Sequence, residues 1–214
     1  MHMFDFKKYQ KIKETINNLG KKTKIIAISK NHTLEQVEKA IAYGLEVFGE
    51  NRVQEAKFKF ENIIKKQKKI ELHLTGPLQT NKIKSALDLF HVFHTIDREK
   101  LLRELSKFED KIQDKSFFIQ VNTGKELTKS GINPEDTKKF LDLCSSYGIK
   151  NISGLMCIPP IKEDPEKHFK LISSLSNELG LGRPSIGMSS DYLEALKFDP
   201  QYIRLGTVLF GKRA

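Results

Sequence analysis

Eight apolar runs rich in β-branched and aromatic residues alternate along this chain with amphipathic stretches. The apolar runs span residues 25–30, 47–50, 71–76, 92–97, 116–122, 152–157, 185–189 and 202–210. Helical spacing marks residues 33–43, 51–66, 79–88, 98–109, 134–146, 165–179 and 190–197, after an opening helix over residues 4–19. Alternation of this kind implies parallel strands joined by right-handed crossovers. The count and the length predict an α/β fold, a single (β/α)8 TIM-type barrel with an extra N-terminal helix, over a doubly wound open sheet.

The length and the cysteine content both suit one cytoplasmic domain. A chain of 214 residues can bury its own core, and no linker divides it, so we expect one domain over residues 1–214. Its two cysteines, Cys144 and Cys157, form neither a disulfide framework nor a CxxC pair. The sequence shows no long uncharged apolar run and no signal-peptide core. These features predict a cytoplasmic protein that binds no membrane.

The chain is strongly basic, with 37 Lys and Arg against 27 Asp and Glu and a net charge of +10. Most of the positive charge is lysine spread over the predicted helices, with local clusters such as residues 65–69. Dispersed lysine is typical of solvated helix faces. No zinc-finger spacing and no RNP-type aromatic motif accompanies it. We therefore expect no specific nucleic-acid partner, and a basic nucleic-acid-binding barrel is kept as an alternative class.

Lys30 ends the first apolar run, and a helical pattern starts soon after it at Thr33. An uninterrupted β-branched run is typical of a strand buried on both faces, so its last residue lies at the mouth of the sheet. In barrel enzymes that position holds catalytic and cofactor-binding groups. A lysine there can form a Schiff base with an aldehyde, which arginine cannot. The alternative is a lysine whose stem packs at the strand end while its amine reaches water.

A second group of candidate ligands follows the seventh and eighth runs. Ser189 and Ser190 lie where a helix starts, and serine hydroxyls with unpaired backbone N–H groups there favour an anion. Gly206 leaves its backbone open to approach, and Thr207 adds a hydroxyl. Barrel enzymes frequently bind phosphate between these loops, although a serine cap beside a glycine bend is the alternative. Because closure puts strand eight beside strand one, the site would neighbour Lys30, and an amine beside a phosphate indicates pyridoxal phosphate.

Two further strand ends carry polar side chains with two interpretations each. Asn51 lies where the second run becomes a helix, so it either caps that helix or directs its amide into the barrel mouth. His73 lies within the third run, and alternation directs it to the barrel interior. There it is either a packed core residue or an imidazole lying against a flat ligand, and a direct role in proton transfer is not expected.

No metal site is predicted. His91 and His94 are three apart in a predicted strand, so they point to opposite faces and cannot chelate one ion. The longest irregular segment, residues 157–165, follows the sixth run and contains prolines that prevent the strand from continuing. On the same barrel face as Lys30, this loop is placed to cover a site.

Seven ordered blocks give the chain a resemblance to a known family. They read IIAISK, FGENRVQEA, LHLTGPLQTNK, FFIQVNTGKELTKSGI, ISGLMCIPP, IGMSSDYLEAL and IRLGTVLFGKR. In order and spacing they resemble the pyridoxal phosphate homeostasis proteins, single-domain relatives of the alanine racemase barrel. The resemblance covers almost the whole chain.

The resemblance implies that Lys30 holds pyridoxal 5′-phosphate (PLP) as a Schiff base. It also implies that Arg204 faces the pyridine nitrogen. A guanidinium there stays charged and keeps the nitrogen unprotonated, which weakens the ring as an electron sink. Nine positions match cofactor-binding residues of the family, of which the second serine is the weakest match: Lys30, Asn51, His73, Met156, Ser189, Ser190, Arg204, Gly206 and Thr207.

The resemblance implies a cofactor carrier and not an enzyme. A racemase of this type needs a base on each face of the substrate Cα. In the related racemases the second base is a tyrosine from a separate β domain, and none of the five tyrosines here matches it. We therefore expect no catalytic residue and a role in intracellular PLP homeostasis, with indirect effects on amino-acid and keto-acid balance. The expected partners are PLP and PLP-dependent apoenzymes, the expected state is a monomer, and the alternative is a weak PLP-dependent amino-acid racemase.

Overall fold

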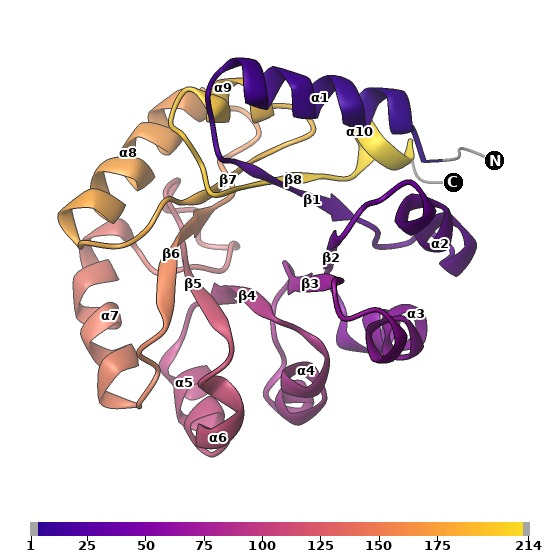
Figure 1. Cartoon of the computed structure of the whole chain (residues 1–214). Coiled ribbons are helices and arrows are strands. Elements are labelled where there is room, and N and C mark those ends of the chain that lie inside the picture. Colours follow the sequence, from indigo (N-terminus) through magenta and orange to yellow (C-terminus); the bar gives the residue numbers. More distant parts are fainter. Residues whose placement is uncertain (1–3, 212–214) are drawn as a thin grey trace.

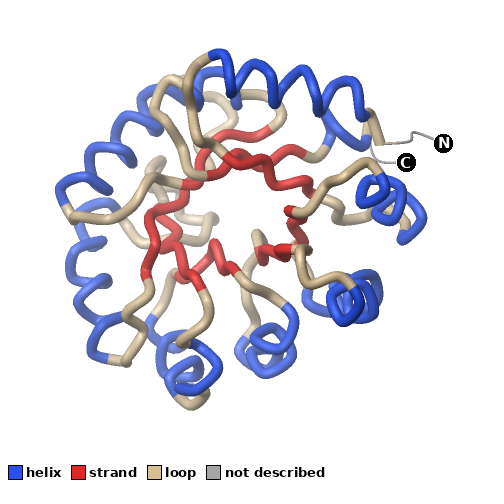
Figure 2. The backbone as a smooth tube through the Cα atoms, viewed as in Figure 1, coloured by secondary structure: helices blue, strands red, loops and turns tan. Residues whose placement is uncertain are grey.

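The computed structural model describes residues 4–211, whose strands form a closed parallel barrel with helices around it (Figure 1). Figure 2 shows the strands as an inner ring and the helices outside it. In neighbour order the strands are β1 (Lys24–Ile28), β2 (Val47–Glu50), β3 (Glu71–Leu74), β4 (Val92–Ile96), β5 (Ser116–Val121), β6 (Ile152–Cys157), β7 (Ser185–Met188) and β8 (Tyr202–Leu205). The (β/α)8 prediction is confirmed. The ends of the predicted 1–214 domain, and Lys212 and Arg213 of the last matched block, lie outside the described residues.

The helices agree with the predicted amphipathic stretches, several of them in two pieces. They are α1 (Phe6–Asn18), α2 (Leu34–Ala42), α3 (Val53–Lys66), η1 (Thr80–Lys82), α4 (Ile83–Leu89), α5 (Glu99–Ser106), α6 (Glu109–Ile112), η2 (Pro134–Asp136), α7 (Thr137–Ser146), α8 (Pro165–Glu178), α9 (Tyr192–Leu196) and α10 (Thr207–Phe210). The extra N-terminal helix is α1, which begins where Asp5 accepts a hydrogen bond from the Lys8 amide.

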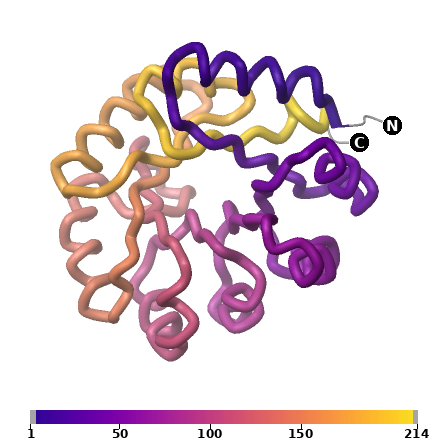
Figure 3. Tube along the Cα trace, viewed as in Figure 1, coloured from indigo at the N-terminus to yellow at the C-terminus, as the bar shows by residue number. Residues whose placement is uncertain are grey.

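The barrel closes where its first and last strands pair. β1 runs parallel to β8, with Ile26 opposite Arg204 and Ala27 opposite Leu205. In Figure 3 the indigo start and the yellow end of the trace lie side by side at this seam. Parallel strands end at the same rim of a barrel, so the segments that follow β1 and β8 share one face. The predicted proximity of strands one and eight is confirmed.

Two apolar cores build the barrel. The larger one lies between the strands and the helices, and a smaller one, inside the barrel, contains Ile26, Ile28, Val92, Phe118, Met156 and Tyr202. Gly49 is required at this inner core, because a Cβ there would approach Ile28 Cδ1 to 2.5 Å and Ile26 Cγ2 to 2.7 Å. The inner layer therefore closes the barrel beneath the rim on which the functional residues were predicted.

The predicted eighth strand, residues 202–210, was too long. β8 ends at Leu205, and residues 207–210 form α10. Phe210 of this helix is fully buried and lies 5.4 Å, ring to ring, from Phe4. A short buried helix and a buried strand are both continuous apolar runs, so periodicity does not separate them. β1 also ends earlier than predicted, at Ile28, which leaves Lys30 in the turn before α2.

Candidate functional site

A cavity of about 320 Å³ opens where the strands reach their carboxyl ends, within the size range of about 300–1,000 Å³ typical of small-molecule sites. It is lined by Ile28, Lys30, Asn51, Thr75, Ile158, Met188, Ser189, Ser190, Arg204, Gly206 and Thr207. Seven of the nine predicted cofactor-binding residues meet in this lining. His73 and Met156 do not, because both are fully buried in the barrel interior.

The β2 end of the cavity is ordered by side-chain hydrogen bonds. Asn51 Oδ1 accepts a bond of 3.0 Å from Thr75 Oγ1, which ties the segment after β2 to the segment after β3. The N-cap of α3 is Arg52, so the interpretation of Asn51 as a helix cap was wrong. A Cβ on Gly76 would lie 2.5 Å from Asn51 O, so glycine is needed for these two segments to pack. Asn51 therefore presents a fixed amide to the cavity.

Arg204 forms the cationic floor of the cavity. Its Nη1 donates to Ser185 O at 2.7 Å and to Ser185 Oγ at 2.8 Å, and its Nη2 donates to Cys157 O at 2.8 Å. These bonds join β8 to β7 and β6 and fix the guanidinium in one orientation. Burial lowers the pKa of Arg204, but the ordinary value is so high that the group stays charged near neutral pH. The site thus contains a permanent, rigidly held donor.

The loops after β7 and β8 are joined by one serine. Ser189 Oγ accepts hydrogen bonds of 3.3 Å from both Gly206 N and Val208 N. The Asp191 carboxylate accepts a bond of 2.6 Å from Met188 N, which closes the turn that carries this serine. Ser189, Ser190, Gly206 and Thr207 all line this side of the cavity, and their hydroxyl groups can donate to an anion such as phosphate.

A continuous polar chain runs from Arg204 through the barrel interior. Ser185 Oγ lies 3.0 Å from His94 Nδ1, His94 Nε2 lies 2.8 Å from His73 Nδ1, and His73 Nε2 lies 2.8 Å from Glu71 Oε1. Neutral histidines satisfy this chain when Ser185 donates to His94 Nδ1 and each histidine carries its proton on Nε2, so that His94 donates to His73 Nδ1 and His73 donates to Glu71. This arrangement makes His73 a part of the support for Arg204, and not a residue of the cavity wall.

The pKa values agree with this protonation. Burial lowers the pKa of His73 and, further, that of His94. The hydrogen bond from His73 is the largest cause that lowers the pKa of Glu71, to about 2. The unfolded chain takes up protons on its histidines below about pH 6.5, while the folded histidines remain neutral, so acid favours unfolding. Glu71 acts in the same direction, with stability lost as the pH falls from its unfolded pKa toward about 2.

We expect His94→Gln to flatten this acid dependence, because glutamine retains a donor and an acceptor but does not titrate. Between pH 7.5 and pH 5 the free energy of unfolding should fall by about 2 kcal/mol more in the wild type than in the variant. The reason is that His94 stays neutral in the folded protein over the roughly 1.5 pH units below the ordinary histidine pKa, where the unfolded chain binds a proton. Urea unfolding at several pH values measures the difference. Parallel pH profiles for the two proteins would contradict the assignment of His94 as neutral.

The sequence interpretation missed three contributors to the site. Thr75 holds Asn51, while Ser185 and His94 link Arg204 to the interior. Strand alternation predicted that His91 and His94 point to opposite faces of the sheet. In the structure His91 Nδ1 accepts a hydrogen bond from the Leu72 amide and takes no part in the chain of bonds that contains His94. What alternation cannot supply is the relative height of residues on different strands.

The loop after β6 takes part in the site, as predicted. Ile158 lines the cavity and also a neighbouring cavity of about 320 Å³, which shares Asn51 and Thr75 and continues toward Gln120. Among residues 4–211 no group of three or more His, Cys, Asp or Glu side chains is placed to hold a metal ion. Cys144 and Cys157 are buried free thiols. The described site is therefore one of amine, amide, hydroxyl and guanidinium groups.

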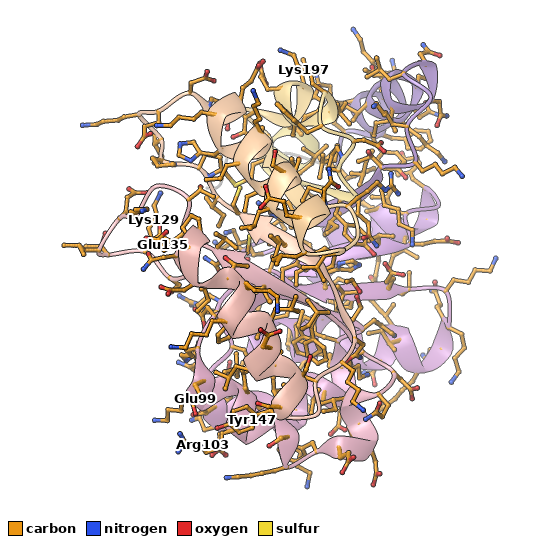
Figure 4. All side chains as sticks on the ribbon, turned by 90° about the vertical axis from the view of Figure 1, so that its left-hand side faces the viewer. Glu99, Arg103, Lys129, Glu135, Tyr147 and Lys197 are labelled. Carbon is orange, nitrogen blue, oxygen red and sulfur yellow. The ribbon has the colours of Figure 1, made fainter. Side chains whose placement is uncertain are left out.

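The surface lysines are interleaved with carboxylates. Ion pairs one helical turn apart include Lys39–Glu35, Lys138–Asp142 and Lys167–Glu163. Figure 4 turns α7 and α8 toward the viewer and labels Lys129 in the loop after β5, Glu135 on η2 and Lys197 at the end of α9. Mixed charges of this kind are typical of solvated helix faces. No helix in the described part of the chain is both long enough and apolar enough to span a membrane.

Comparison with known proteins gives one consistent result. The family model described as alanine racemase, N-terminal domain, matches residues 7–214. A pyridoxal phosphate homeostasis protein of Aquifex aeolicus (strain VF5) is 37% identical over 202 residues, covering 89% of this chain and 87% of that protein. One from Buchnera aphidicola subsp. Schizaphis graminum is 35% identical over 216 residues, covering 95% and 93%.

The structural neighbours have the same fold. PipY of Synechococcus elongatus PCC7942, solved with PLP bound, superposes with a TM-score of 0.83 at 29% identity, covering 96% of this chain and 99% of that chain. Alanine racemase from Acinetobacter baumannii gives a TM-score of 0.73 at 15% identity, covering 99% of this chain and 64% of that chain. At that identity the racemase shares the barrel fold alone.

Proposed function

This chain belongs to the pyridoxal phosphate homeostasis protein family, within the alanine racemase N-terminal domain group, and we propose that it holds PLP as a Schiff base on Lys30. One observation carries the proposal. A single cavity combines the amine of Lys30, the fixed guanidinium of Arg204 and the hydroxyl and amide donors around Ser189 and Gly206. The PLP-bound structure of PipY supports it.

The donor set fits the chemical groups of PLP. When bound, PLP supplies an aldehyde that condenses with a primary amine. Ser189, Gly206 and Thr207 would hold the phosphate, with Ser190 beside them, and Asn51 would line the ring. Arg204 would face the ring nitrogen without giving up a proton, because a guanidinium has no tendency to deprotonate at neutral pH. His73 and Met156 support the site from the barrel interior, Met156 as an adaptable apolar residue.

The protein acts as a carrier that limits free PLP and supplies PLP-dependent apoenzymes, as a cytoplasmic monomer. Racemisation needs a base on each face of the substrate. Among the described residues, the cavity lining contains Lys30 as an amine but no tyrosine. Buried free thiols suit a reducing compartment. Changes in amino-acid and keto-acid balance then follow from PLP supply.

Turnover measurements separate the carrier from a weak racemase. The PLP-loaded protein is incubated with L-alanine or L-serine, and the D-enantiomer is quantified by chiral chromatography beside a Lys30→Ala control. We expect the wild type to retain the visible absorbance of bound PLP through desalting and to form no more D-amino acid than the control. Steady turnover that is lost in Lys30→Ala would establish the racemase instead. Absence of retained PLP, together with salt-resistant binding of RNA or DNA, would favour the nucleic-acid alternative.

A further inference from the structure

A buried cluster of charged side chains lies behind the turn that carries Lys30. Lys59 of α3 is only 3% exposed, and its Nζ lies 2.6 Å from Glu50 Oε1 and 2.8 Å from Glu55 Oε1. Glu50 is fully buried, and its Oε2 has no hydrogen-bond partner. Burying such charges costs desolvation free energy that the ion pair often fails to recover. Stability alone is therefore a weak explanation for the cluster.

The ammonium of Lys59 also binds the backbone on both sides of Lys30. Its Nζ donates to Ser29 O at 2.7 Å and to His32 O at 3.2 Å. These two carbonyls bracket Lys30 and Asn31, so one cation holds both ends of the turn. An ammonium has no acceptor and a compact charge, which suits it to gather carbonyl and carboxylate oxygens around one point.

The two glutamates accept hydrogen bonds from other atoms of the same turn. Ser29 Oγ donates to Glu50 Oε1 at 2.7 Å, and the Asn31 amide donates to Glu55 Oε1 at 2.5 Å. Asn31 has φ of 62°, in the left-handed region that asparagine enters more readily than other non-glycine residues. The turn that carries Lys30 is thus held by three charged side chains.

The cluster reaches the opposite side of the cavity as well. Glu50 O accepts a bond of 2.9 Å from Thr75 N, and Asn51 follows directly in the chain. These contacts are made by the backbone of Glu50, so they remain available when only its side chain is replaced. The charged cluster therefore contacts both the turn that carries the Lys30 amine and the segment that carries the Asn51 amide.

We propose that Lys59, held by Glu50 and Glu55, is a positioning residue that sets the backbone from which Lys30 attacks the aldehyde. This inference rests on the proposed function. Schiff-base formation joins the Lys30 nitrogen to the aldehyde carbon and releases the aldehyde oxygen as water, with the ammonium proton lost to solvent. A misplacement of about 1 Å in such a step costs up to about 100-fold in rate. Lys59 itself does not line the cavity.

The test uses the double variant Lys59→Met with Glu50→Gln, which removes both charges and leaves a side-chain oxygen at position 50 for Ser29 Oγ. Stopped-flow absorbance measures the rate of Schiff-base formation with PLP. Equilibrium dialysis measures affinity for pyridoxine 5′-phosphate, which carries the same ring and phosphate but no aldehyde. We expect the rate to fall about 10- to 100-fold while affinity for the analogue changes less than about threefold.

Lys57→Met is the matched control, because Lys57 lies on the same helix but is exposed. Its Nζ lies 3.9 Å from Glu61 Oε1, which makes a long surface ion pair. It should leave both measurements unchanged. If the double variant does not fold, as judged by circular dichroism, Glu55→Gln tests the same turn through the Asn31 amide and should slow the rate severalfold.

The possible failures are distinguishable. A wild-type protein that forms no Schiff base contradicts the proposed function itself. A folded variant that forms it at the wild-type rate, beside a competent wild type, overturns only the role of Lys59. Equal losses in the rate and in affinity for pyridoxine 5′-phosphate also overturn it, because they indicate general damage to the cavity.

Discussion

Lys30→Ala is expected to abolish covalent retention of PLP. The variant removes the one amine in the described cavity lining, while the donors around Ser189 and Arg204 remain. The phosphate and ring contacts should still bind PLP reversibly, so a desalting column should strip the visible absorbance completely from the variant and not from the wild type. The affinity for PLP should fall at least about 100-fold, since the loss of a covalent bond exceeds that of ordinary contacts, each worth about 1 kcal/mol.

Lys170→Ala is a suitable control for this loss. Lys170 is an exposed lysine on α8, outside the cavity lining. Its removal should change neither the retained absorbance nor the affinity for PLP. Retention of PLP by Lys30→Ala at the wild-type level would mean that other lysines of this basic chain carry the cofactor, and the assignment of the site would be wrong.

Arg204→Met is expected to give the largest loss of stability among the site variants. It leaves Ser185 O, Ser185 Oγ and Cys157 O without their buried donor. Each orphaned buried group costs about 1–3 kcal/mol, so the free energy of unfolding should fall by about 3 kcal/mol once partial relaxation is allowed for. Urea unfolding of the cofactor-free protein measures this fall in the free energy of unfolding. PLP affinity of the folded fraction should fall as well, because the ring loses its fixed donor.

Arg183→Met provides the contrast. Arg183 pairs with Asp199 at 3.3 Å, and both side chains are more than a third exposed. A surface ion pair of this kind is worth at most about 1 kcal/mol. A similar unfolding free energy for the two arginine variants would contradict the structural role assigned to the bonds between Arg204, Ser185 and Cys157.

Much of the architecture follows from sequence pattern because the barrel repeats one strand and one helix. Buried strands in such a fold are continuous β-branched runs, and β1, β5 and β6 were recognised in this way. The segment after Gly206 shows where the pattern stops being informative. Thr-Val-Leu-Phe is as apolar as a strand, yet in the structure it forms α10, whose Phe210 packs against Phe4.

The candidate site was predictable where it depends on chain order alone. Lys30, Asn51, Ser189 and Gly206 each follow a strand, and closure of the barrel gathers them at one rim. His73 and Met156 were assigned to the cofactor from the family resemblance, but the structure places both in the interior.

The positions of the supporting residues required the three-dimensional structure. Lys59 reaches the turn at Lys30 because α3 packs against β2 with Lys59 on its buried face. His94 contacts Ser185 across the barrel, although the two residues are 91 positions apart in the sequence. Hydrophobic periodicity identifies which face of an element is buried, but it carries no information about which buried polar groups meet.

Chemical mapping of the wild-type protein shows which lysine carries PLP. The protein is loaded with PLP, reduced with borohydride so that the Schiff base becomes a stable amine, digested, and analysed by peptide mass spectrometry. We predict one stoichiometric pyridoxyl modification, on Lys30. Modification spread over exposed lysines, or none at Lys30, would contradict the account.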